Sequence, residues 1–132
     1  MKKIIKRGEV YYANLNPAIG SEQGGFRPVI ITQNDRGNYY SPTTIVVPLT
    51  SREKTYLPTH CTIDDKSVLP YRSCAMAEQL RVIDKQRLGR CVGSLDKETM
   101  QRLGMSMLIS LAIEYDLLDM IKPLDNRRHL LN

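Results

Sequence analysis

Residues 28–49 read PVIITQNDRGNYYSPTTIVVPL, and this stretch decides the fold class of the chain. Its two ends, residues 28–33 and 43–49, are rich in Val, Ile and Thr, which favour strands. Residues 34–42 between them carry Asn, Asp, Gly, Ser and Pro, which are typical of turns. The stretch is therefore predicted to form two strands joined by a turn-rich connection.

The same pattern of short strands and turns extends over the first ninety residues. Further strands are predicted at residues 9–15, 59–63, 74–79 and 90–94, and a single helical turn at residues 83–88. Residues 16–26 form a long first connection that is dense in polar and Gly residues. Several short strands at this spacing indicate a small closed or nearly closed β-structure.

The hydrophobic period changes after residue 95. Apolar side chains then recur at the i, i+3, i+4, i+7 positions of one buried helix face. These side chains are Met100, Leu103, Met107, Leu108, Leu111 and Tyr115. Asp96 is the expected N-cap and Pro123 ends helical structure, so we expect one helix followed by a frayed surface tail from residue 124.

Length and charge bound the classes of protein that this chain can belong to. Its 132 residues suit one domain, and its apolar content suits a packed core. The most apolar segment, residues 103–121, contains three acidic residues, so no membrane span is expected, and the N-terminus lacks the apolar run of a signal peptide. We therefore expect a cytoplasmic protein. The formal net charge of +5 favours an anionic partner, and the basic excess lies in residues 1–60.

Several familiar chemistries have no support in the sequence. Cys61, Cys74 and Cys91 lack the paired spacing of a zinc site and are interpreted as small core residues, although a catalytic thiol stays open. His60 and His129 are far apart in the chain, which argues against a two-histidine ribonuclease, and His60 is interpreted as a structural strand residue. No motif of a Ser hydrolase, a nucleotide-binding loop or a zinc protease occurs.

Three short polar segments at strand ends are candidates for a functional site. Arg27 follows the long connection and precedes Pro28, which biases Arg27 to an extended conformation, so its guanidinium can be held over the loop. Thr50, Ser51 and Arg52 follow the strand at residues 43–49 and offer hydroxyl groups and a cation to a phosphate. The third segment, residues 78–81, reads EQLR, and its alternating polar side chains could read base edges.

Several motifs taken together resemble the MazF/PemK toxin family. The motifs are KRGEVY at residues 6–11, GSEQGGFRPV at residues 20–29, QND at 33–35, GN at 37–38, SPT at 41–43, LPTH at 57–60 and EQLRVIDKQRL at 78–88. The resemblance covers roughly residues 4–116. Residues 1–116 are accordingly expected to form one toxin domain, and residues 117–132 an extension to which no role is assigned.

The resemblance implies a mainly β fold with a C-terminal helix, namely a small SH3-like barrel of the MazF/PemK/CcdB type. It also implies a homodimer, a cognate antitoxin that occupies the RNA groove, and a metal-independent, sequence-specific endoribonuclease without a cofactor. In such enzymes the ribose 2′-hydroxyl attacks its own phosphate and leaves 2′,3′-cyclic phosphate and 5′-hydroxyl ends. The family's catalytic arginine falls on Arg27 and its catalytic threonine on Thr50.

The implied reaction assigns roles to further residues. A guanidinium stays protonated at neutral pH, so Glu22 or a water is the expected proton acceptor rather than Arg27. A small barrel cannot enter the deep major groove of A-form RNA, so single-stranded RNA is the expected target. The expected RNA-binding residues are Ser21, Gln23, Phe26, Ser51, Arg52, Tyr56, Glu78, Gln79 and Arg81, with Tyr39 and Tyr40 as further rings for base stacking.

Two alternatives remain at this point. The same barrel can carry a non-catalytic toxin, such as one that poisons gyrase, because a fold does not fix a function. The second alternative is a relative that binds RNA but no longer cleaves it. The intact Arg27 and Thr50 positions favour the ribonuclease.

Overall fold

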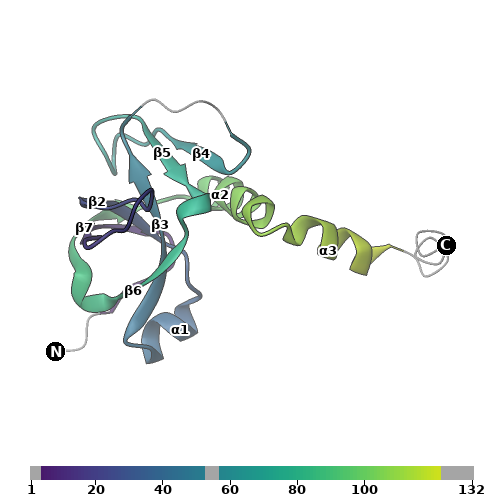
Figure 1. Ribbon diagram of the computed structural model, residues 1–132, viewed down its shortest axis with the longest axis horizontal. Helices are drawn as coiled ribbons and strands as arrows, with labels where there is room; N and C mark the ends of the chain where they lie inside the picture. Colours follow the sequence, from purple (N-terminus) through teal and green to yellow (C-terminus); the bar gives the residue numbers. More distant parts are fainter. Residues whose placement is uncertain (1–3, 53–56, 123–132) are drawn as a thin grey trace.

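The structure is a computed structural model that describes residues 4–52 and 57–122 (Figure 1). Its strands are β1 (Glu9–Asn14), β2 (Phe26–Ile31), β3 (Thr43–Thr50), β4 (His60–Ile63), β5 (Ser73–Met76), β6 (Arg81–Asp84) and β7 (Leu88–Ser94). Its helices are α1 (Asp35–Tyr40), α2 (Lys97–Ser110) and α3 (Ile113–Ile121), with 3-10 turns η1 (Ala77–Gln79) and η2 (Lys85–Arg87). The described part of the chain is thus mainly β with helices at its C-terminal end.

The strands form one antiparallel sheet in the order β4-β5-β3-β2-β1-β7, with β6 paired to the other half of β3. Strand β3 is the longest, and it pairs with β6 at its start, β2 in its middle and β5 at its end. Strands β6 and β7 are joined directly through η2. The five strands β6-β3-β2-β1-β7 therefore curl into a small barrel, which confirms the predicted fold class.

The core consists of two clusters, because alternate residues of a strand point to opposite faces. Val10, Ile30 and Val47 belong to a cluster that also contains Met100 and Leu103 of α2. Their neighbours Tyr11, Val29 and Val46 belong to a second cluster, which fills the barrel and includes Ile83 of β6 and Leu88 of β7. Each fully buried aliphatic side chain of this kind stabilises the fold by about 1.5–3 kcal/mol. Both faces of the central strands are thus buried, which explains their nearly continuous apolar runs.

The predicted strands are confirmed, apart from small shifts at their ends and the strand at residues 74–79, which stops at Met76 and continues as the 3-10 turn η1. Two connections also differ from the prediction. Residues 34–42 contain α1, because Asn34 caps a helix there: its side-chain oxygen accepts a hydrogen bond from the Gly37 N–H at 2.8 Å. Asn and Asp favour both turns and helix N-termini, so the composition alone did not separate the two. Residues 83–88 do contain the helical turn η2, but the residues before it form β6, which the sequence analysis missed.

The single long helix of the prediction is wrong beyond Ser110. The Asp96 carboxylate caps α2 as expected and accepts from the Thr99 N–H at 2.8 Å. Helix α2 then ends, and Ala112 adopts the left-handed conformation with φ 58° before α3 begins. This break changes the helical phase after Leu111, and Tyr115 beyond it is 70% exposed. Leu111, at the end of α2, is also exposed, at 54%. Helix α3 projects away from the sheet (Figure 1).

The prediction that the three cysteines are core residues does not hold for all of them. Cys61 is buried, Cys74 is half-buried and Cys91 is exposed on β7. Burial raises the pKa of the Cys61 thiol, which disfavours the reactive thiolate. The interpretation as core residues is therefore wrong for Cys91.

Within residues 4–52 and 57–122, no helix is both long and apolar enough to cross a membrane. The same residues contain no group of three or more His, Cys, Asp and Glu side chains that could hold a metal ion.

Candidate active site

Arg27 and Thr50 lie at the neighbouring ends of two paired strands. Strands β2 and β3 are antiparallel, with Val29 opposite Pro48. Continuing this register by two residues in each direction places Arg27 opposite Thr50, at the start of β2 and the end of β3. Two side chains that are separated by twenty-two intervening residues are thus neighbours at one end of the barrel. The structure brings the two predicted catalytic positions together.

Hydrogen bonds join the start and the end of the connection at residues 16–26, just before Arg27. The Asn16 side-chain oxygen accepts from the Gly25 N–H at 2.9 Å, and the Leu15 N–H donates to the Gly25 carbonyl at 2.9 Å. Gly24 passes so close to Ala18 and Asn16 that a Cβ atom would lie 2.8 Å from each. Only glycine fits this close approach, which explains one of the two glycines that precede Phe26.

The Arg27 guanidinium is held by backbone carbonyls from both sides. Its Nε donates to the Gly24 carbonyl at 2.8 Å, and its Nη1 donates to the Leu49 carbonyl at 3.2 Å. With the Gln23 amide turned so that its oxygen faces Arg27, that oxygen accepts from Nη2 at 2.8 Å and from Nη1 at 3.3 Å. Burial, and then the nearby charge of Arg52, lower the pKa of Arg27. A guanidinium stays protonated at neutral pH, so Arg27 acts as a cation and donor, not as a base.

Thr50 is the most buried of the hydroxyl candidates, with 6% of its surface exposed. Its Oγ1 accepts from the Arg52 N–H at 3.3 Å. Ser51 and Arg52 themselves are exposed. This end of β3 therefore presents one fixed hydroxyl beside two accessible polar side chains.

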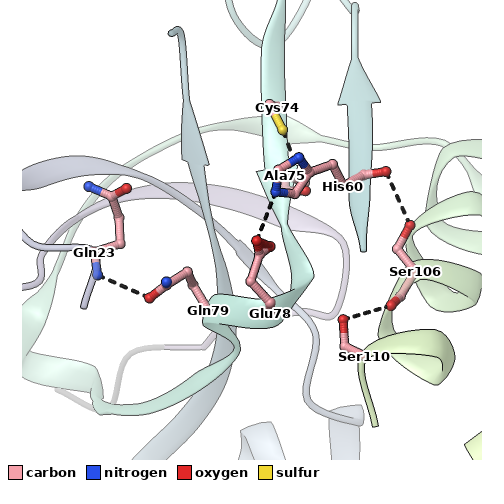
Figure 2. A network of polar contacts seen from close by, with 8 residues as sticks. All are labelled: Gln23, His60, Cys74, Ala75, Glu78, Gln79, Ser106 and Ser110. Atoms are coloured by element: carbon pink, nitrogen blue, oxygen red, sulfur yellow. Dashed lines mark hydrogen bonds and ion pairs between the residues drawn. The ribbon is translucent and has the colours of Figure 1, made fainter. Parts of the chain in front are cut away.

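Gln79 connects the site to the first connection. The backbone N–H of Gln23 donates to the Gln79 side-chain oxygen at 3.0 Å (Figure 2). The neighbouring Glu78 carboxylate instead contacts His60 Nε2 at 2.8 Å. Arg81 donates from Nη1 to the Leu15 carbonyl at 3.2 Å, at the base of the connection. Of the predicted EQLR segment, Gln79 thus lies nearest in the hydrogen-bond network to Arg27.

Other predicted residues lie farther along the connection or outside the site. Ser21 and Glu22 are exposed, and the Glu22 carboxylate accepts from the Ile19 N–H at 3.0 Å. Tyr39 and Tyr40 form an edge-to-face pair on α1, which follows the far end of β2 from Arg27. Tyr56 lies outside the described residues. The structure therefore does not bring Tyr39 and Tyr40 together with Arg27.

An aromatic patch beside Arg27 was only half predicted. Phe26 is 67% exposed and stacks on Tyr12 of β1, with ring centroids 5.5 Å apart and an interplanar angle of 13°. The Arg90 guanidinium carbon lies 5.9 Å from the Tyr12 ring centroid. A hydrogen bond with Tyr12, and then burial, raise the pKa of Tyr71. Tyr12 follows the buried Tyr11 on β1, and alternate residues of a strand point to opposite faces. This alternation was the one sequence signal that could have identified Tyr12 as an outward-facing ring.

The arrangement can bind a phosphodiester and flat rings at once. A half-buried guanidinium and a fixed hydroxyl can stabilise the nonbridging oxygens of a phosphate as charge develops on them. An exposed Phe ring backed by Tyr, with Arg close by, is a stacking surface that suits unpaired bases. The site therefore has the chemical features of a nuclease that acts on single strands.

Comparison with known proteins agrees with this class. Residues 6–111 match the family model described as PemK-like, MazF-like toxin of type II toxin–antitoxin system. Endoribonuclease EndoA of Bacillus subtilis (strain 168) is 50% identical over 112 residues, which cover 83% of this chain and 97% of the relative. The chain belongs to the PemK-like, MazF-like toxin family.

Solved structures share the fold. MazF from Deinococcus radiodurans superposes with a TM-score of 0.75 at 22% identity, over 83% of this chain and 98% of that chain. An endoribonuclease from a mycobacterial species, solved in complex with its cognate antitoxin, gives a TM-score of 0.69 at 23% identity, over 82% of this chain and 95% of that chain.

Proposed function

We propose that this toxin is a sequence-specific, metal-independent endoribonuclease that cleaves single-stranded RNA and thereby inhibits translation. The observation that carries the proposal is Arg27, which is half-buried and held by two carbonyls, one of them that of Leu49, the residue before Thr50. The 50% identity to an endoribonuclease supports the same activity. A non-catalytic toxin on the same barrel would not need an arginine fixed and desolvated in this way.

In the proposed reaction, the ribose 2′-oxygen forms a bond to phosphorus as the bond from phosphorus to the 5′-oxygen breaks. The products are a 2′,3′-cyclic phosphate and a 5′-hydroxyl. Arg27 and the Thr50 hydroxyl donate to the nonbridging oxygens, whose negative charge is greatest in the transition state. The 2′-hydroxyl gives its proton to Glu22 or to a water, because Arg27 already carries its proton. A proton returns from the same acceptor or from solvent to the leaving 5′-oxygen.

RNA binding is assigned to the side chains around this pair. Phe26, backed by Tyr12, stacks on a base, and Gln79 and Gln23 form hydrogen bonds to base edges. Ser21, Ser51, Arg52 and Arg81 complete the proposed contact surface, whereas Glu78, which was also expected to bind RNA, is paired with His60. Arg81 also supports the connection through the Leu15 carbonyl, so its replacement is expected to loosen the loop as well as weaken binding.

Partners follow from the same family. We propose a homodimer and a cognate antitoxin that covers the RNA-binding groove, as a mycobacterial relative has been solved with its own antitoxin. Messenger RNA and such an antitoxin both occur in the cytoplasm, and we place the toxin there.

The test is cleavage of a long single-stranded RNA in EDTA by the wild type and by Arg27→Ala. Discrete cuts that end in 2′,3′-cyclic phosphate, and that the variant lacks, are expected. If the wild type binds RNA but does not cleave it, the proposed endoribonuclease activity is contradicted. Absence of both binding and cleavage would favour the gyrase-poison alternative.

A further inference from the structure

His60 and Glu78 form a polar pair at the edge of the proposed RNA site. His60 is the first residue of β4, and Glu78 is the middle residue of the 3-10 turn η1. Their Nε2 and Oε2 atoms are 2.8 Å apart, and the side chains are 9% and 35% exposed. Figure 2 shows the Glu78 carboxylate pointing towards the imidazole ring of His60. A nine-tenths buried histidine with a carboxylate partner is a defined contact rather than a loose surface pair.

The surroundings of His60 fix which nitrogen carries its proton. Nδ1 is buried and has no hydrogen-bond partner among the described residues. A proton on Nδ1 would therefore be a buried donor without an acceptor, which is costly. The favoured tautomer therefore donates from Nε2 to Glu78. The contact is thus a directional hydrogen bond to a carboxylate.

Both partners are fixed on the side away from the active site. The Ser106 hydroxyl of α2 donates to the His60 carbonyl at 3.4 Å. The Ala77 N–H at the start of η1 donates to the Thr59 carbonyl at 3.0 Å. The pair therefore ties η1, a turn of only three residues, to β4 and through β4 to α2. A short 3-10 turn has few internal hydrogen bonds, so such a tie determines where its last residue points.

The last residue of η1 is Gln79, and it leads directly to Arg27. Its side-chain oxygen accepts the Gln23 N–H at 3.0 Å. The Gln23 amide oxygen, facing Arg27, accepts from the guanidinium at 2.8 Å. The path from β4 to the proposed catalytic arginine thus runs through two side-chain contacts, His60–Glu78 and Gln23–Arg27. The backbone between Glu78 and Gln79 and the Gln23 N–H bond to Gln79 connect these two contacts.

We propose that His60 and Glu78 are positioning residues, which hold Gln79 so that the Gln23 loop keeps Arg27 in its reactive orientation. The proposal rests on the proposed function, since it concerns the geometry of the same site. It assigns Glu78 an effect through Gln79, in place of a direct contact with a base. Displacement of a reacting group by about 1 Å can cost about a hundredfold in rate, so a remote hydrogen bond can matter this much.

The first experiment measures geometry without RNA. Hydrogen exchange of the Gln23 backbone N–H reports its bond to Gln79. We expect Glu78→Ala to accelerate this exchange by about tenfold, and Glu78→Gln, which keeps an acceptor for Nε2, to leave it near the wild-type rate. Asp64→Ala, which breaks an exposed ion pair with Lys66, is the matched control and should not change it. Equal Gln23 exchange in Glu78→Ala and wild type would overturn the proposal.

The second experiment measures single-turnover cleavage by the same variants. Glu78→Ala is expected to lower the cleavage rate by about tenfold or more, while Glu78→Gln and His60→Gln, which supplies an amide N–H near the position of Nε2, stay within about threefold of wild type. In a Gln79→Ala background, Glu78→Ala should cause no further loss, because the pair acts through Gln79. Full additivity of the two losses would overturn the proposal.

The two experiments distinguish failure of the proposed function from failure of the positioning role. If the wild type does not cleave RNA, the proposed function fails, and the exchange of the Gln23 N–H still decides the positioning role. If the wild type cleaves and Glu78→Gln is as impaired as Glu78→Ala, the carboxylate itself is needed and the positioning role is wrong. Because Glu78 is partly exposed, its variants are expected to fold even where a substitution of the buried His60 is not tolerated.

Discussion

Two polar clusters occupy opposite ends of the β2–β3 pair, and they are built differently. The α1 cluster is centred on Asn38, which is 1% exposed and whose amide donates to the Gln33 carbonyl and accepts from the Thr44 hydroxyl at 2.8 Å. The active-site cluster is centred on Arg27, which is half-buried and bonded mainly to loop and strand carbonyls. The first cluster encloses its polar groups; the second keeps a cation beside solvent.

The difference shows how to distinguish a structural polar group from a functional one. A buried group with all its hydrogen bonds made inside the protein contributes to the fold and has nothing left for a ligand. A half-buried cation that is oriented by neutral carbonyls retains its charge for an anionic ligand. The comparison therefore predicts that substitutions at the α1 end change stability, and that substitutions at the Arg27 end change activity.

The largest effect is expected for Arg27→Ala. Loss of the oriented donor removes stabilisation of the transition-state charge, so single-turnover cleavage should fall by about a thousandfold. The free energy of unfolding, measured by urea titration, should change by less than about 1 kcal/mol, because the side chain is half-buried and its partners can be hydrated. A large loss of stability together with activity would place Arg27 in the same structural class as Asn38.

Asn38→Ala is expected to have the next largest effect, and on the opposite property. The substitution leaves the buried Thr44 hydroxyl without its acceptor and removes a packed side chain, so unfolding should become easier by about 3 kcal/mol. Cleavage at a temperature well below the melting point should stay within about threefold of wild type. Urea titration measures the loss of stability, and single-turnover cleavage by the same sample measures the activity.

The sequence predicted most of the fold because the signals were local. The Val- and Ile-rich run of β3 and the Met100 and Leu103 spacing of α2 each depend on side chains near in sequence. The break at Ala112 was not predictable, because alanine is the best helix former and rarely adopts the left-handed conformation that it has here. Strand β6 was missed because only Ile83 in it is buried.

The candidate site divides in the same way. Arg27 and Thr50 were identified from motifs, and the strand register explains why those two positions meet. The stacking of Phe26 on Tyr12 and the His60–Glu78 contact were missed because each partner lies on another strand or turn, and such cross-chain pairing leaves no local pattern. The prediction that His60 lies on a strand is confirmed, since it is the first residue of β4.

Thr50→Val tests the role of the Thr50 hydroxyl with a nearly isosteric substitution. Loss of the hydroxyl donor should lower the cleavage rate by about ten- to a hundredfold and leave RNA affinity nearly unchanged. The matched control is Thr32→Val, because the Thr32 hydroxyl donates to the Ile45 carbonyl at 3.0 Å beyond the far end of β2. That variant should lose about 1 kcal/mol of stability and no activity. Equal activity losses in the two variants would remove Thr50 from the reaction.

The smallest effect is expected for Asp35→Asn, which tests the electrostatics of the α1 end. The backbone N–H of Arg7 donates to the Asp35 carboxylate at 2.7 Å and is the main reason that the pKa of Asp35 lies below its ordinary value of 3.8. A depressed pKa in the folded state stabilises the fold above the unfolded-state pKa, and this contribution disappears as the pH falls through the folded-state pKa.

Because the Asp35 carboxylate is exposed, its contribution should be less than about 1 kcal/mol. Urea titrations of wild type and Asp35→Asn should therefore differ slightly at pH 7. The difference should shrink as the pH falls below 3.8 and vanish once the pH is below the folded-state pKa of Asp35. Asp64→Asn, which changes an exposed ion pair, serves as the control for charge alone. A difference between Asp35→Asn and wild type that is constant with pH would mean that hydrogen-bond geometry, not charge, stabilises the start of α1.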